Sequence, residues 1–206
     1  VRAIFGATTL ADLAAALRPS GAVEVPPNRI AADCTRLTPE LLPLVRLTQA
    51  EIDAAVASVE GGAANVQDIY PLAPLQEGLL FHHRVSVHGD AYLGTSVLAF
   101  DSRAYLDAFV ASLNAVVARH DILRTGFAWQ GLREPVQIVW RHAPLPLHEH
   151  TGDAPDVLAA LKAHMAPGSS RLDVTQAPLL RGHLVEDRQQ SRWLLGLQTH
   201  HLVIDH

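Results

Sequence analysis

Residues 192–206, RWLLGLQTHHLVIDH, form an apolar run that ends in two adjacent histidines and a carboxylate. Successive side chains of a β-strand point to opposite faces, so a strand over 193–204 separates His200 from His201. One ring can face a cavity as an acid, a base or a hydrogen-bond donor. The other must pack beneath the strand with its nitrogens bonded inside the protein. The run thus predicts a strand that carries a proton-handling group, although an apolar strand can also hold a histidine without a chemical role.

The composition is that of a soluble globular protein with ample core material. The chain has 206 residues, of which 49% are hydrophobic and 18% charged. Its net charge of -5, with scattered Lys and Arg, argues against nucleic-acid partners and against a polybasic membrane surface. A single cysteine, Cys34, excludes an intramolecular disulfide and favours a reducing, cytoplasmic setting. No apolar run reaches the roughly twenty residues of a membrane span.

The N-terminal part contains two capped helices separated by a proline-rich segment. Thr9-x-x-Asp12 begins a short amphipathic helix, which ends before Pro19. Residues 19–43 hold prolines and no sustained period, which is typical of a linker. Thr48-x-x-Glu51 begins the second helix, and a Gly-Gly pair at 61–62 ends it. Because the chain begins without Met, we interpret it as a piece of something longer.

The remaining two thirds alternates helical and strand periodicity. We expect helices over 74–83, 101–119 and 155–165, and strands over 92–100, 127–129, 136–140, 145–150, 179–185 and 193–204. The polar turn 186–191 joins the last two strands into a hairpin, which places the dihistidine at the far end of one arm.

Three phrases occur in a fixed order along this region. They are YPLAPLQEGLLF over 70–81, RHDILRTGF over 119–127 and HHLVID over 200–205. They resemble the first three signature motifs of condensation domains from nonribosomal peptide synthetases, the second as RHxxLRTxF and the third as HHxxxDG. The segment 171–181 resembles the strand-entry segment of the same family, and residues 1–17 resemble the last helix of a peptidyl carrier domain.

The resemblance implies an α/β sandwich fold like that of chloramphenicol acetyltransferase, with a mixed sheet and flanking helices. In this family two subdomains form a V around a tunnel, and phosphopantetheine arms enter it from opposite sides. The chain would then comprise a carrier helix over 1–18, a linker over 19–47 and an N-terminal subdomain over 48–206, truncated before the second subdomain. Such a fragment would be inactive alone.

The resemblance also assigns roles to the third phrase, with His200, His201 and Asp205 as its catalytic motif. His201 faces the tunnel, where it orients or deprotonates the acceptor α-amine or stabilises the tetrahedral intermediate. His200 and Asp205 look structural. A buried carboxylate without a partner is costly, so we expect Asp205 to pair with Arg124 or, alternatively, Arg119.

The implied partners are other domains of a synthetase. The resemblance gives the domain no directly bound cofactor and no metal. The 4'-phosphopantetheine is carried by the upstream and downstream peptidyl carrier domains, and an adenylation domain is adjacent.

Two features depart from the usual pattern. His206 stands where the family has glycine, which removes a flexible backbone position. In addition, HHRVSVHGD over 82–90 resembles the HH[I/L]xxxxGD motif of dual epimerisation/condensation domains, in which the matching residues are His82, His83, Gly89 and Asp90. Arg84 replaces the aliphatic residue. Alternatively, the two histidines only stabilise a helix terminus.

Other interpretations of these residues remain open. The domain could condense without epimerisation, or dock a carrier without catalysis. His200-x4-Asp205 also fits the spacing of glycerolipid acyltransferases. Imidazole and carboxylate groups suit zinc or iron, and two histidine-rich sets could supply them: His82, His83 and His88, or His200, His201, Asp205 and His206.

Overall fold

The computed structural model describes residues 6, 8–16, 26–168 and 170–204. Asp205 and His206, and therefore the last residue of the third phrase and its flank, lie outside the described residues. The helices are α2 (Leu10–Ala16), α3 (Gln49–Ala57), α4 (Pro74–Val85), α5 (Arg103–Arg119) and α6 (Val157–His164), with short 3-10 turns η1 (Pro39–Leu41), η2 (Gly62–Asn65) and η3 (Asp121–Arg124). The strands are β1 (Val66–Pro71), β2 (Leu93–Phe100), β3 (Thr125–Ala128), β4 (Val136–Trp140), β5 (Leu147–His150), β6 (Leu180–Asp187) and β7 (Arg192–His200).

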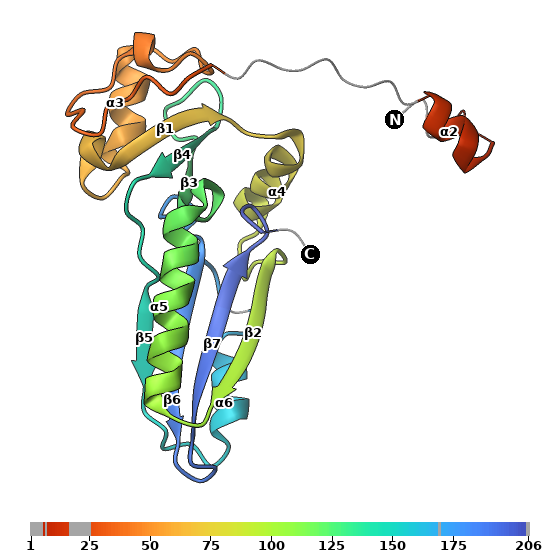
Figure 1. Ribbon diagram of the computed structural model, residues 1–206, viewed down its shortest axis with the longest axis vertical. Helices are drawn as coiled ribbons and strands as arrows, with labels where there is room; N and C mark the ends of the chain where they lie inside the picture. Colours follow the sequence, from red (N-terminus) through yellow and green to blue (C-terminus); the bar gives the residue numbers. More distant parts are fainter. Residues whose placement is uncertain (1–5, 7, 17–25, 169, 205–206) are drawn as a thin grey trace.

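In the described part of the chain the strands form two sheets (Figure 1). The smaller sheet has the order β1-β4-β3 and is antiparallel. The larger has the order β2-β7-β6-β5, in which β5 runs parallel to β6 and the other pairs are antiparallel. The predicted mixed sheet is thus the larger one, and β2 and β5 are its edge strands.

Both faces of the larger sheet are covered, which explains the continuous apolar run of β7. Leu195 packs with Leu106 of α5 on one face, whereas Leu194 packs with Leu161 of α6 on the other. Figure 1 shows α5 and α6 on opposite sides of the sheet. A strand buried on both faces carries apolar side chains without alternation. Periodicity alone therefore could not show which face of β7 packs against which helix.

Local sequence signals predicted several boundaries correctly. At the start of α3, Thr48 Oγ1 accepts from the Glu51 amide at 3.3 Å while Glu51 Oε2 accepts from the Thr48 amide at 2.8 Å, which is the predicted capping box. The hairpin of β6 and β7 is also confirmed, since its register pairs Asp187 with Arg192 at the turn. Strand β4 has the predicted bounds.

Two predictions at strand level were wrong. Strand β1 was missed, because VQDIYP mixes polar and apolar residues without alternation. Strand β7 was expected to reach residue 204 but ends at His200, whose partner Leu93 is the first residue of β2. Beyond it the chain turns, and the Val203 amide donates to the His200 carbonyl at 3.1 Å.

Part of the proline-rich segment belongs to a core. Ile30, Leu37, Leu42 and Leu47 are buried against α3 and the smaller sheet. Burial of these four side chains differs from the open linker that the composition indicated, because four dispersed apolar residues suffice to anchor an otherwise irregular segment. The division at residues 18 and 47 itself stays a prediction, as does the assignment of residues 1–18 to a carrier domain. No helix in the described ranges is both long and apolar enough to cross a membrane.

Candidate active site

The carboxylate of Asp90 joins the two dihistidine phrases. Its Oδ2 lies 2.6 Å from Nδ1 of His83, in the last turn of α4, and 3.1 Å from Nε2 of His200, at the end of β7. Its Oδ1 accepts from the Tyr92 amide at 3.0 Å. His83, Asp90 and His200 are each at most 4% exposed. A buried carboxylate is stable only when its oxygens accept such bonds, so we refer to these three residues as the Asp90 triad.

Hydrogen bonding fixes the tautomer of His200. The Leu202 amide donates to His200 Nδ1 at 3.1 Å, so Nδ1 carries a lone pair and Nε2 carries the proton given to Asp90. Burial lowers the pKa of His200 to about 4, although the nearby Asp90 charge opposes this. Burial raises the pKa of the Asp90 carboxyl, but the hydrogen bonds from Tyr92 and His83 outweigh burial and leave this pKa below its ordinary value. At neutral pH the triad therefore holds a neutral His200 and an ionised Asp90.

The loop before Asp90 requires a glycine at position 89. Gly89 has φ of +63°, and a Cβ there would lie 2.4 Å from the Pro167 carbonyl oxygen. The close approach lets the Asp90 amide donate to the same oxygen at 2.8 Å. The Gly89-Asp90 pair of the second dihistidine phrase thus has a structural reason: the glycine allows the loop to turn and the aspartate then enters the core.

His201 lies in the turn after β7, on the wall of a cavity. Its amide donates to the Tyr92 carbonyl at 3.0 Å, and its Nδ1 lies 3.2 Å from the Ile204 carbonyl. A carbonyl only accepts, so Nδ1 carries the proton and Nε2 is the basic nitrogen of the neutral ring. The cavity measures about 540 Å³ and is lined by the 75–79 face of α4, Ala91, Tyr92, Ile122 and residues 201–204.

Gln76 connects the first phrase to the third. Its amide nitrogen donates to the Leu202 carbonyl at 3.1 Å, and its oxygen accepts from the Ala73 amide at 2.9 Å at the start of α4. Gln76 also lines the His201 cavity. Gln76 was not among the predicted site residues, although it lies inside the YPLAPLQEGLLF phrase.

Each dihistidine has one buried and one more exposed ring. His83 and His200 belong to the triad, and their rings meet edge to face at 5.4 Å. His82 is exposed, and its ring lies 5.8 Å from the ring of Tyr92, a residue of the His201 cavity wall. His82 is also placed one helical turn beyond Leu79 on the α4 face that lines this cavity. The two more exposed rings, His82 and His201, thus both belong to residues that contact Tyr92.

The family model of the condensation domain matches residues 66–206. The chain belongs to the condensation domain family. Among its relatives, malpinin synthetase from Mortierella alpina is 48% identical over 205 residues, which cover 98% of this chain and 3% of that protein. Malpibaldin synthetase from the same organism is 46% identical over 208 residues, covering 100% of this chain and 4% of that protein. A component of the linear gramicidin synthase from Brevibacillus parabrevis is 31% identical over 174 residues, which cover 82% of this chain and 2% of that protein. The chain therefore spans only a few per cent of these relatives' length.

Solved structures with the same fold include other condensation domains. A four-domain nonribosomal peptide synthetase bound to AMP and glycine superposes with a TM-score of 0.58 at 18% identity, over 68% of this chain and 11% of that one. A variant of the starter condensation domain of rhizomide synthetase superposes with a TM-score of 0.56 at 19% identity, over 75% of this chain and 34% of that one. These likenesses confirm the predicted fold class, an α/β fold like that of chloramphenicol acetyltransferase with flanking helices.

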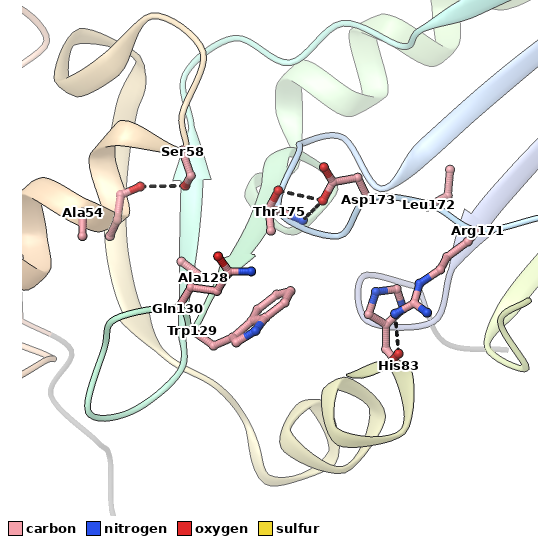
Figure 2. A pocket seen from close by; sticks show the side chains of 11 residues that line it. Ala54, Ser58, His83, Ala128, Trp129, Gln130, Arg171, Leu172, Asp173 and Thr175 are labelled. Carbon is pink, nitrogen blue, oxygen red and sulfur yellow. Dashed lines mark hydrogen bonds between the residues drawn. The ribbon is translucent and has the colours of Figure 1, made fainter. Parts of the chain in front are cut away.

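A second cavity of this condensation domain lies beside the end of α4 (Figure 2). It measures about 660 Å³, and its lining includes His83, Trp129, Arg171 and Thr175. The Arg171 guanidinium donates to the carbonyls of His83 and Ser86, which lie at the C-terminus of α4. A cation at this end of a helix satisfies its last carbonyls and the helix dipole. Arg171 therefore holds the α4 terminus against the strand-entry segment.

The two arginines proposed as partners of Asp205 have different surroundings. Arg124 is 5% exposed, and its guanidinium donates to Asp121 Oδ1 at 2.6 Å, to Gln67 Oε1 at 3.0 Å and to the Trp140 carbonyl. It thus ties η3 to the smaller sheet. Arg119 ends α5 and is exposed. Because Asp205 lies outside the described residues, its pairing stays a prediction.

The structure does not bring together all the residues of either group that the sequence suggested as metal ligands. His83 and His200 come within ligand distance of each other with Asp90, but His88 is exposed and His201 faces the cavity. In the triad both imidazoles donate to Asp90 and the second nitrogen of His200 accepts from Leu202. Hydrogen bonds account for this cluster without an ion.

Proposed function

We propose that this condensation domain belongs to a nonribosomal peptide synthetase, where it forms a peptide bond between two carrier-bound substrates after epimerising the donor residue. The donor is an aminoacyl or peptidyl thioester and the acceptor is an aminoacyl thioester. Both substrates are carried on 4'-phosphopantetheine arms of upstream and downstream carrier domains, with an adenylation domain adjacent. We place the reaction in the cytoplasm.

The position of His201 is the single observation that carries the condensation step. His201 lines the 540 Å³ cavity, and the bond from Nδ1 to the Ile204 carbonyl leaves Nε2 as the basic nitrogen. The amide bond to Tyr92 fixes the backbone on which the ring stands. A group held in this way can position an amine without a change of its own conformation.

The reaction requires little base strength from His201. The acceptor amine attacks the donor thioester carbonyl, the C–N bond forms, and the C–S bond breaks with release of the donor thiolate. His201 Nε2 accepts the proton that the amine loses or a hydrogen bond from it, and the proton reaches the leaving thiolate. The triad supports this step indirectly, because Asp90 holds His200 and thereby the turn that carries His201.

The second dihistidine phrase supports epimerisation of the donor. Racemisation at a carbon next to a thioester carbonyl requires removal of one proton and its return from the opposite face. His82 is exposed beside Tyr92, so it can transfer a proton, whereas His83 is buried against Asp90 and positions the loop. We therefore assign proton transfer to His82 and a positioning role to His83.

Other functions fit the geometry less well. Condensation without epimerisation leaves His82 with no task beyond the helix terminus. A glycerolipid acyltransferase would need His200 to reach a hydroxyl substrate, but His200 is fully buried and bonded at both ring nitrogens. A purely docking role leaves the ordered tautomer of His201 without purpose.

The test uses the complete synthetase in heavy water, with both carriers loaded. We expect the wild type to form the peptide and to incorporate deuterium at the donor α-carbon. His201→Ala should reduce peptide formation by at least about a hundredfold, the range of a lost general acid or base, while carrier loading is unchanged. Near-normal peptide formation by this variant would exclude His201 as the catalytic residue. If the wild type forms the peptide without incorporating deuterium, the domain condenses without epimerising the donor.

A further inference from the structure

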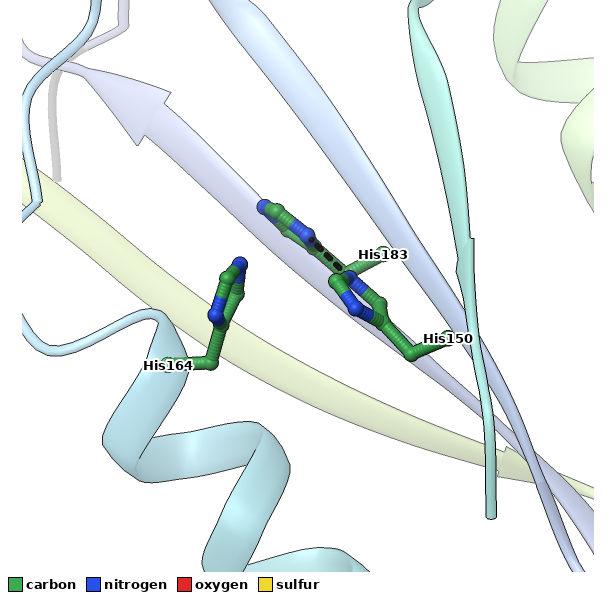
Figure 3. Close-up of side chains that lie close together, drawn as sticks. All are labelled: His150, His164 and His183. Atoms are coloured by element: carbon green, nitrogen blue, oxygen red, sulfur yellow. Dashed lines mark hydrogen bonds between the residues drawn. The ribbon is translucent and has the colours of Figure 1, made fainter.

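A second histidine cluster lies near the middle of the larger sheet, where His183 of β6 pairs with Gly196 of β7 (Figure 3). His150 ends the edge strand β5, His183 lies on β6 and His164 ends α6. One ring nitrogen from each residue lies within 4.8 Å of the other two. The ring centroids of His164 are 4.6 Å from His150 and 5.1 Å from His183.

Gln198 determines which nitrogen of His183 faces this cluster. The amide nitrogen of Gln198 donates to the Met165 carbonyl at 3.1 Å and to Ser170 Oγ at 2.8 Å, so its oxygen faces His183. That oxygen lies 3.0 Å from His183 Nε2 and accepts its proton. His183 therefore presents the lone pair of Nδ1 to His150. Histidines that bind metals commonly donate their other N–H to an oxygen in this manner.

In the metal-free cluster His150 and His183 face each other across a single proton. His150 Nε2 lies 2.9 Å from His183 Nδ1. Because His183 Nδ1 carries a lone pair, His150 Nε2 donates its proton across this contact, and a proton on both facing nitrogens would oppose two donors and make His183 a cation. His183 is therefore neutral in this arrangement, which is the form in which an imidazole ligates a metal.

We propose that His150 Nε2, His164 and His183 Nδ1 bind one borderline-soft divalent cation of the zinc class. Three imidazoles suit Zn²⁺, and tetrahedral ligation at about 2.0 to 2.1 Å separates neighbouring nitrogens by about 3.4 Å. His150 and His183 need to separate by a few tenths of an ångström, and exposed His164 moves inward. On binding, the ion replaces the proton between His150 and His183, and His150 carries its proton on Nδ1. The fourth position is open to water.

The surroundings provide a route for the ion. A cavity of about 240 Å³ is lined by His150, His164, Thr151 and apolar residues of α6. The bound ion links the edge strand β5, which pairs only with β6 in the larger sheet, to the end of α6. We therefore expect it to stabilise this edge of the sheet, by an amount that rises with the logarithm of the free ion concentration once that exceeds the dissociation constant.

The experiment compares the complete protein, free of affinity tags, with His164→Ala and with His148→Ala. His148 stacks on His183 at 5.6 Å but is not one of the three ligands, so it is the matched control. After chelation and dialysis, each protein is titrated with Co²⁺ and Zn²⁺. Metal content, cobalt ligand-field absorption and the melting temperature are measured.

We expect the wild type and His148→Ala each to bind one tightly held ion that His164→Ala does not bind. The cobalt form of these two proteins should have a tetrahedral spectrum. Zinc should raise their melting temperature and leave that of His164→Ala unchanged. Because His164 is exposed, the metal-free variant should melt like the metal-free wild type. Equal metal content in wild type and His164→Ala overturns the proposal, as does equal loss in His148→Ala. A spectrum without tetrahedral bands also overturns it.

Discussion

Asp90 and His200, 110 positions apart in the sequence, are joined by a hydrogen bond of 3.1 Å between Oδ2 and Nε2. The same oxygen accepts from His83, so one carboxylate connects the last turn of α4 to the end of β7. The more exposed partner of each dihistidine, His82 or His201, projects from a backbone that this carboxylate fixes. The geometry of the candidate active site therefore depends on a residue that need not touch substrate.

Replacing Asp90 by asparagine should destabilise the fold. The side chain keeps its volume but has one acceptor oxygen for three donors, so at least one buried donor is orphaned at about 1 to 3 kcal/mol each. The control is Asp107→Asn, which breaks an exposed pair with Arg103 that contributes at most about 1 kcal/mol. Chemical denaturation measures both. Equal small losses in the two variants would mean that the Asp90 bonds contribute little to stability.

Stability should fall on acidification through the pKa range of His200. Its folded pKa is about 4 and its ordinary value is 6.5, so the unfolded state binds more protons between these values. The contribution is complete above pH 6.5 and is lost as pH falls toward 4, about 3 kcal/mol in all. The Asp90 carboxyl titrates below its ordinary pKa of 3.8, outside this window.

The pH dependence is measured by denaturant unfolding of the wild type and His200→Gln between about pH 4 and 7. Glutamine can still donate to Asp90 but cannot ionise. We expect a shallower slope in the variant, with the remainder coming from His150 and His183, whose lowered pKa values give slopes of the same sign. Identical slopes in the two proteins would contradict the buried, neutral state of His200.

Alanine substitutions at two glycines distinguish the cost of backbone strain from the cost of steric crowding. Gly89→Ala adds a Cβ at 2.4 Å from the Pro167 carbonyl oxygen, whereas Gly131→Ala, at φ of +72°, meets nothing within 4 Å. The left-handed conformation costs both variants about 1 to 2 kcal/mol. Thermal melting should show a larger loss for Gly89→Ala, which also displaces the loop that carries Asp90. A loss no greater than that of Gly131→Ala would mean that the loop relaxes freely.

The sequence predicted the elements better than their contacts. Regular elements such as β4 and α5 follow from local periodicity, and the Thr48 cap follows from residues three apart. The role of Asp90 could not be derived in this way, because its bond to His200 depends on the register of β2 with β7, which no local pattern determines. The family resemblance pointed to both dihistidine phrases and to Asp90, but not to the bond that joins Asp90 to His200.

The three-histidine cluster shows the same limit. His148 and His150 alternate on one face of a predicted strand, which was a visible signal. His183 meets them only because β5 pairs with β6 in parallel, with His148 opposite His183. A parallel neighbour cannot be assigned from the sequence of either strand, so the cluster emerged only from the fold.

The two histidines of the second phrase, His82 and His83, should respond differently to substitution, because the first is exposed and the second is buried. His82→Asn removes an exposed ring, so we expect an unchanged melting temperature, with deuterium uptake at the donor α-carbon reduced by about a hundredfold, as for a lost proton-transfer group. His83→Leu keeps much of the side-chain volume but removes a donor to the buried Asp90, so both the melting temperature and the deuterium uptake should fall.

His88→Asn is the control for this pair, because His88 is exposed in the loop that follows α4 but makes no ring contact with Tyr92 in the described structure. It should leave both melting and deuterium uptake unchanged. If His82→Asn retains full exchange while His201→Ala abolishes it, His201 performs both proton transfers and the exposed ring of His82 only ends the helix. If His82→Asn lowers the melting temperature as much as His83→Leu, the division of the pair into a proton-transfer residue and a positioning residue is wrong.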